Sequence, residues 1–227
     1  NMESMFHMDT GLTSLNVAYW NTGNLVRAMV VFHYLSSLKS LDVSNWNTSK
    51  MQDALAIFSG SSSLTDLDVS NWDTSSLVNA TSMFNGTTSL ANLDVSKWNT
   101  SNVTTMEMMF YNSGVENLDL HKWDMHNVQK VTKMFKSTNM NTLNVSGWNL
   151  DAATDLPELF DNNPYMETYS GVVNLNASNM IFGKSITSLA SLFTHLTSLK
   201  TINLSGWDLS NITDLTDLFA NDTALET

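Results

Sequence analysis

A tryptophan recurs along this chain every 25 or 26 residues, with one longer interval before the last, and this period limits the possible folds more than any other feature. A phenylalanine follows each tryptophan twelve residues later. A repeat of this length is typical of a solenoid, in which each unit buries its apolar face only by packing on its neighbours. The tryptophans are Trp20, Trp46, Trp72, Trp98, Trp123, Trp148 and Trp207.

Before each tryptophan lies an alternating segment that predicts a short, half-buried strand. Residues 41–44 read Leu-Asp-Val-Ser, and the same pattern returns at 67–70 and 93–96. Alternation of period two places Leu and Val inside and Asp and Ser outside. With Leu38 three positions earlier, the line reads Leu-x-x-Leu-x-Val, which matches the core of a leucine-rich repeat.

After each tryptophan the apolar spacing changes and predicts a short helix. Val103, Met106, Met109 and Phe110 recur at the three- and four-residue intervals of one helical face. Ser101, two residues before this line, takes the place of an N-cap. We therefore expect an α/β, leucine-rich-repeat-like solenoid, with a short parallel strand plus a short helix in each 25–26-residue unit.

The repeat predicts that residues 1–227 form a single solenoid of about eight units, with partial units at the two ends. Both ends interrupt a unit, so we expect the sequence to belong to a longer protein whose export signal and wall anchor lie elsewhere. Apolar residues in the end units lack a covering neighbour, which makes end-to-end self-association an expected property.

One stretch, 155–183, is irregular. The interval from Phe160 to Leu175 is fifteen residues, where the other units have eight or nine. Because insertions are tolerated on surfaces, we expect the extra residues to form a protrusion. Its tyrosines, Tyr165 and Tyr169, are candidate ligand contacts.

Composition excludes several classes of function. The formal net charge is −12, from 10 Lys and Arg against 22 Asp and Glu, which disfavours nucleic acid and anionic membranes as partners. There is no cysteine, and no apolar run approaches the ~18 residues that insertion into a membrane requires. Neither a nucleophile with a local base nor a glycine-rich phosphate loop is found, so we expect no enzymatic activity.

The repeat Leu67-Asp68-Val69-Ser70-Asn71-Trp72-Asp73-Thr74-Ser75 resembles the BspA-like leucine-rich repeats of bacterial surface proteins, in the form found in lactic-acid bacteria and mycoplasmas. The resemblance covers nearly the whole chain and is weak from Asp155 to Gly183. It implies an extracellular, wall-anchored protein associated with adhesion to host or matrix components. It supplies no defined ligand-binding residues.

The aromatic and methionine columns are interpreted as core. Trp and Phe fall in phase with the inward Leu and Val, although exposed rings would form a platform for sugars. Met83, Met106, Met109 and Met134 fit helical core better than a copper site. A threonine column, including Thr48 and Thr74, is interpreted as part of the structural repeat rather than as a flat ice-binding array.

The aspartate column is the main candidate site. Its members should stack about 4.8 Å apart on the exposed sheet face. Like charges so close destabilise a sheet unless hydrogen bonds offset them, so a structural role and a ligand-binding role are both open. The candidate ligand contacts on this face are Asp42, Asp66, Asp68, Asp94, Asp119, His121 and Lys122.

A metal site is a weaker alternative at the same place. Asp94, Asp119 and His121 share one face, and a row of carboxylates is compatible with Ca²⁺. No other cofactor is expected.

The function expected from these observations is adhesion. The exposed sheet face would bind a host mucin, another glycan or an extracellular-matrix protein. The alternative is a structural stalk with no ligand of its own, which holds another domain away from the cell wall.

Overall fold

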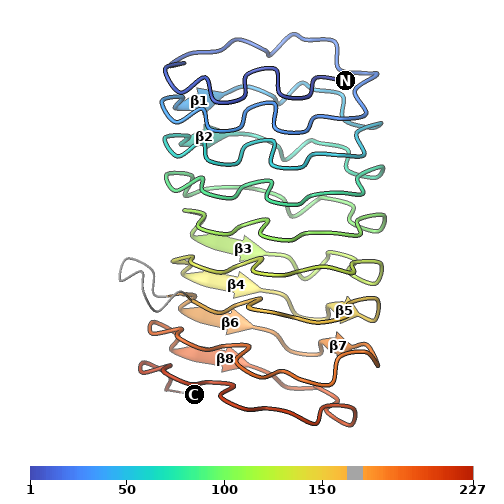
Figure 1. Ribbon diagram of the computed structural model, residues 1–227, viewed down its shortest axis with the longest axis vertical. Coiled ribbons are helices and arrows are strands. Elements are labelled where there is room, and N and C mark those ends of the chain that lie inside the picture. The colour runs from blue at the N-terminus through green and yellow to red at the C-terminus, as the bar shows by residue number, and fades with distance from the viewer. Residues whose placement is uncertain (163–170, 227) are drawn as a thin grey trace.

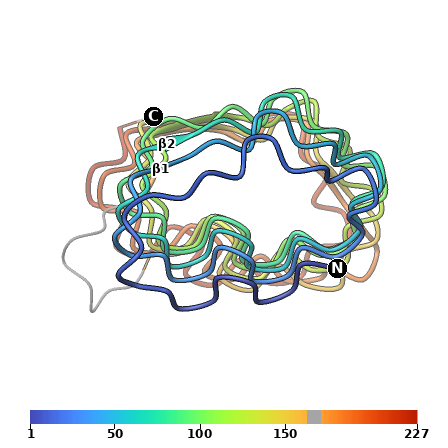
Figure 2. The same cartoon turned by 90° about the horizontal axis from the view of Figure 1, so that it is seen from above.

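The computed structural model describes residues 1–162 and 171–226, which form one stack of flattened coils around a continuous apolar core (Figure 1). Seen along the stack, each coil is an elongated ring with two broad sides (Figure 2). The labelled strands β1 and β2 lie on one broad side, which we call the sheet face. The side that each coil follows on its return is here called the turn face.

The strands are short and all their pairings are parallel. They form three small sheets, ordered β1-β2, β3-β4-β6-β8 and β5-β7. Within the largest sheet, Leu118, Leu143, Leu175 and Ile202 are in register, so one apolar residue of each coil stacks on the next. The strands are β1 (Ser40–Leu41), β2 (Asp66–Leu67), β3 (Asn117–Asp119), β4 (Thr142–Asn144), β5 (Asn149–Leu150), β6 (Asn174–Asn176), β7 (Ile181–Phe182) and β8 (Thr201–Asn203).

The predicted helix of each unit is absent: none of the described residues is helical, and the expectation of an α/β fold is wrong. The amides of Ala54, Ala56 and Phe58 donate to carbonyls of the next coil at 3.0, 2.8 and 3.2 Å, instead of four residues back along the chain. Between them, the Ile57 amide donates to the Ala54 carbonyl at 3.2 Å and closes a tight turn. The three-residue apolar spacing therefore marks successive turns and not a helical face.

Backbone conformation gives the same result. Ala56, in the middle of the predicted helix, has φ +51°, and its counterparts Ser82 and Met108 have φ +55° and +54°. A left-handed residue cannot continue a right-handed helix. In place of a helix, each coil has a series of turns whose amides donate hydrogen bonds to carbonyls of the next coil.

The serines predicted as helix caps close corners instead. Ser75 Oγ donates to Asp73 Oδ1 at 2.6 Å, and Ser101 Oγ donates to Asn99 Oδ1 at 2.7 Å. Each is a local turn in which the side chain two residues earlier accepts the bond. These corners lie between the strand and the turn face.

Pro157 lies at a turn position that does not need a backbone N–H. At the equivalent position of other coils, the amides of Leu55 and Thr81 donate to side chains and take no part in the coil-to-coil ladder. A residue without an N–H is therefore tolerated there. The Pro157 carbonyl still accepts from the Lys133 amide at 3.1 Å.

The aromatic columns are core, as predicted. Trp72 is 4% exposed and Phe84 is 0% exposed. Trp72 stacks on Trp98 with ring centroids 6.3 Å apart and an interplanar angle of 3°. The side chains of Met83, Met106, Met109 and Met134 are buried in the same core, and Thr48 and Thr74 are buried as well. The buried positions exclude a sugar platform on the columns and a flat threonine array.

The irregular stretch keeps its place in the stack where it is described. Met180 is buried at the tryptophan position, β6 pairs with β4 and β8 in the coils on either side, and β7 pairs with β5. The predicted protrusion, with Tyr165 and Tyr169, falls mainly on residues outside the described part of the chain.

Candidate functional site

The sheet face carries one outward column that changes character along the stack. It begins with aspartates and continues with asparagines in the same register. Asp119 of β3 pairs with Asn144 of β4, and Asn144 pairs in turn with Asn176 of β6. We call this the central column. Its members are Asp42, Asp68, Asp94, Asp119, Asn144, Asn176 and Asn203.

Hydrogen bonds from the next outward position hold these carboxylates in place. Asp68 Oδ1 accepts from Ser70 N at 2.9 Å and from Ser70 Oγ at 2.7 Å. Asp94 accepts from Ser96 in the same way, at 3.0 and 2.7 Å. The serine hydroxyl is the main cause that lowers the pKa of both carboxyls below its ordinary value. The charged form is therefore favoured despite the neighbouring aspartates.

Asp119 has a different partner and links the two halves of the column. His121 Nδ1 lies 2.7 Å from Asp119 Oδ1, and Asn144 Nδ2 donates to the same oxygen at 2.8 Å. Burial raises the pKa of Asp119, but hydrogen bonds from His121 and Asn144 and the charge of His121 outweigh it, and the pKa is lowered. The hydrogen bond between Asn144 and Asp119 thus connects the asparagine half of the central column to its aspartate half.

Open hollows lie between successive strands along this face. The first, of about 250 Å³, includes Asp42, Asp66 and Asp68. The second, of about 430 Å³, includes Asp94 and Asp119. The third, of about 520 Å³, is lined by Thr142, Leu143, Asn144, Asn174, Leu175, Asn176, Thr201, Ile202 and Asn203.

A comparison with known protein families finds one whose model matches most of the chain. The model of the family described as "Mycoplasma protein of unknown function, DUF285" matches residues 1–68, 56–172 and 187–227. The chain belongs to the DUF285 family. No curated protein and no solved structure matches the chain.

The structure of this DUF285 chain brings together most of the predicted site residues. Asp42, Asp66 and Asp68 share one hollow, and Asp94 and Asp119 share the next. Lys122 is exposed but is not among the residues that line these hollows. Tyr165 and Tyr169 lie outside the described residues.

The predicted metal set is not assembled in the described part of the DUF285 chain. His121 contacts Asp119, but no group of three or more His, Cys, Asp or Glu side chains there is arranged to hold a metal ion. Likewise, the described residues contain no helix that is long and apolar enough to cross a membrane.

The amide half of the face was not predicted as part of the site. Its signal is present in the sequence, because Asn144 and Asn176 occupy the aspartate position and are followed by Ser146 and Ser178 at the serine position. Thr142 Oγ1 donates to Asn117 Oδ1 at 2.8 Å, and Thr201 Oγ1 donates to Asn174 Oδ1 at 2.8 Å. The face therefore offers carboxylates at one end and both donors and acceptors at the other.

Proposed function

We propose that this chain is a non-enzymatic adhesive module of a bacterial cell-surface protein, and that its sheet face binds a host or matrix ligand. The observation that carries the proposal is the row of hollows along the sheet face, lined by carboxylates, amides and hydroxyls that repeat at the spacing of the strands. A flat, repetitive row of this kind matches a ligand that is itself repetitive.

The ligand class follows from the chemistry of the face. Carboxylate and amide oxygens accept hydrogen bonds from sugar hydroxyls, and the amide nitrogens of Asn144 and Asn176 can donate to ring and hydroxyl oxygens. Shallow repeated sites bind weakly one at a time and gain strength through multivalency. Mucin, other glycans and glycosylated matrix proteins present such arrays.

The resemblance to BspA-like surface repeats supports an extracellular, wall-anchored location. In that setting many copies of the face would be displayed together. The hydrogen-bonded serines favour the alternative, a stalk without a ligand, because they show that the aspartates also stabilise corners of the scaffold.

The test replaces Asp68 and Asp94 together by Asn. Asn144, with Ser146, already occupies the same corner, so the fold should persist. The matched control replaces Asp73 and Asp208 by Asn at the second corner, where Asn99 naturally occupies the equivalent place. Both double variants remove two charges, but only the first changes the sheet face.

Binding to immobilised mucin, a glycan array and matrix proteins is then compared at equal melting temperature. We expect the first variant to lose binding and the control to keep it. Equal binding by both variants, or no binding by the parent chain, would favour the stalk.

A further inference from the structure

A separate hollow lies at the edge where the turn face ends and the chain returns toward the sheet face. One column of left-handed residues follows this edge: Tyr34, Gly60, Gly86 and Asn112 have φ +58°, +72°, +70° and +53°. The hollow has a volume of about 470 Å³, within the range of small-molecule sites. It has no residue in common with the hollows of the sheet face.

Two adjacent glycines open this hollow. A Cβ at Gly86 would meet only the Gly60 backbone, at 3.5 Å, which is an ordinary contact. Left-handed geometry alone does not demand glycine in this column, because Asn112, Ser137 and His195 hold the same conformation. The missing side chain at position 86 therefore leaves open space, whereas the Tyr34 ring occupies the space beside Gly60.

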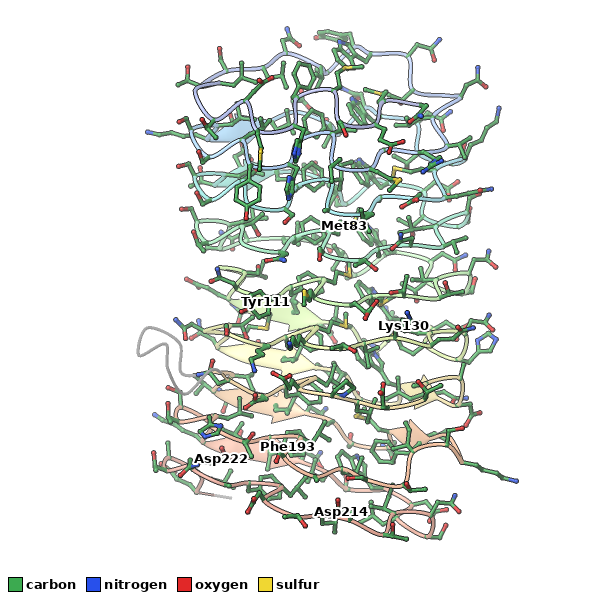
Figure 3. The ribbon with its side chains drawn as sticks, in the orientation of Figure 1. Met83, Tyr111, Lys130, Phe193, Asp214 and Asp222 are labelled. Carbon is green, nitrogen blue, oxygen red and sulfur yellow. The ribbon has the colours of Figure 1, made fainter. Side chains whose placement is uncertain are left out.

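Two tyrosines, Tyr34 and Tyr111, are among the residues that line the hollow. The Tyr34 ring lies against Gly60, where an added Cβ would come within 2.8 Å of it. Tyr34 is 46% exposed, and its ring and that of His33 are nearly perpendicular, with centroids 4.4 Å apart and an interplanar angle of 87°. Tyr111, labelled in Figure 3, comes from the coil that follows the two glycines.

The remaining lining is polar and uncharged. Ser36, Ser62 and Thr88 contribute hydroxyls, and Asn85 and Asn112 contribute amides. Asn112 Oδ1 is buried and has no hydrogen-bond partner in the structure. A buried carbonyl oxygen without a donor is unfavourable, and a ligand hydroxyl would satisfy it.

We propose that this hollow binds a neutral saccharide. The apolar C–H groups of a sugar ring would pack on the exposed part of the Tyr34 side chain, while its hydroxyls pair with the amides and hydroxyls that line the hollow. No charged side chain lines the hollow, and the net charge of −12 disfavours acidic sugars. The site is independent of the sheet face and of the function proposed for it.

The experiment uses maltose, lactose, cellobiose and N,N′-diacetylchitobiose as probes, with a glucuronic-acid disaccharide as the charged comparison. Binding is detected by saturation-transfer difference NMR and measured by titration calorimetry. The key variant is Gly86→Asn, which places in the hollow the side chain that Asn112 carries in the next coil. Tyr34→Ala removes one aromatic wall, and Tyr19→Ala, at a tyrosine that is 89% exposed and does not line the hollow, is the matched control.

We expect at least one neutral disaccharide to bind, and Gly86→Asn and Tyr34→Ala to weaken that binding about tenfold or more, while Tyr19→Ala leaves it unchanged. Failure of all four neutral probes to bind would overturn the proposal. So would unchanged binding by a folded Gly86→Asn variant. Loss of disaccharide binding only in the Asp68→Asn, Asp94→Asn variant would assign the sugars to the sheet face, which refutes this site and leaves the adhesive face standing.

Discussion

The indole Nε1 of Trp72 donates to the main-chain oxygen of Val43 in the preceding coil, at 3.1 Å. Trp98 donates to Val69 in the same way, also at 3.1 Å. Each tryptophan therefore fills the core and also gives a main-chain carbonyl of the preceding coil a second donor, since the Val43 carbonyl already accepts from the Trp46 amide at 3.1 Å. This double role explains why the tryptophan recurs so strictly.

The first prediction concerns this bond and the burial of the ring. Trp72→Ala should destabilise the fold by about 3–5 kcal/mol, because it leaves a cavity. Trp72→Phe should cost less, about 0.5–1.5 kcal/mol for the lost bond, because the Val43 carbonyl keeps the Trp46 amide as a donor. Denaturant unfolding measures both. Tyr19→Ala, at an exposed ring, is the control, and an equal effect of Tyr19→Ala and Trp72→Ala would contradict the role assigned to the column.

The second prediction separates the turn ladder from a helix. Ser82 has φ +55°, which costs an L-residue roughly 1 kcal/mol, so Ser82→Gly should raise the free energy of unfolding by up to about that amount. In a helix the same change would lower it by about 0.5–1 kcal/mol. The sign of the shift in thermal or urea unfolding decides between the two backbones.

Asp222 provides a pH-dependent prediction. Burial raises the pKa of its carboxyl from 3.8 to about 6, against opposing effects of the Leu196 amide and His195, while Asp161 raises it further. A raised carboxyl pKa means that the folded state holds the proton more tightly than the unfolded state. The stability that this group contributes is therefore complete below pH 3.8 and is lost as the pH rises through about 6.

Asp222→Asn should consequently raise the melting temperature at pH 7.5 and change it little at pH 4. After allowance for solvent exposure, the gain at pH 7.5 is on the order of 1 kcal/mol. Asp217→Asn, an exposed carboxylate in the same coil, removes the same charge. An equal gain from both variants would show that net charge, and not the burial of Asp222, is responsible.

The last prediction concerns self-association. Leu215 is 45% exposed, whereas its counterparts Ala54, Met106 and Leu189 are buried under the following coil. We expect this chain to associate end to end at high concentration, and Leu215→Glu to suppress the association. Val78→Glu, at an exposed position of a central coil, should not. Sedimentation velocity over a concentration series gives the answer, and a monomer at every concentration would refute the expectation.

Periodicity in the sequence was enough to predict the stack, the inward aromatic columns and the outward aspartates. It placed the parallel strands only in part, because β1 and β2 overlap the predicted segments 41–44 and 67–70 by one residue each and 93–96 contains no strand. These features depend on which residues are apolar and how far apart they stand, because stacking of identical units buries every apolar column at once. The exposed position of Asp68 and the buried position of Phe84 both follow from that rule.

Tertiary structure alone decided the conformation of the return segment and the shape of the surface. Apolar residues three apart fit a helix and a run of turns equally well, and the choice was made by the next coil, whose carbonyls accept the amides of Ala56 and Phe58. Likewise, Gly60 and Gly86 line a common hollow with Tyr34 only because the stacking of coils places these three residues next to one another. Hydrogen bonds and spaces between coils join residues about one repeat apart, so no local pattern contains them.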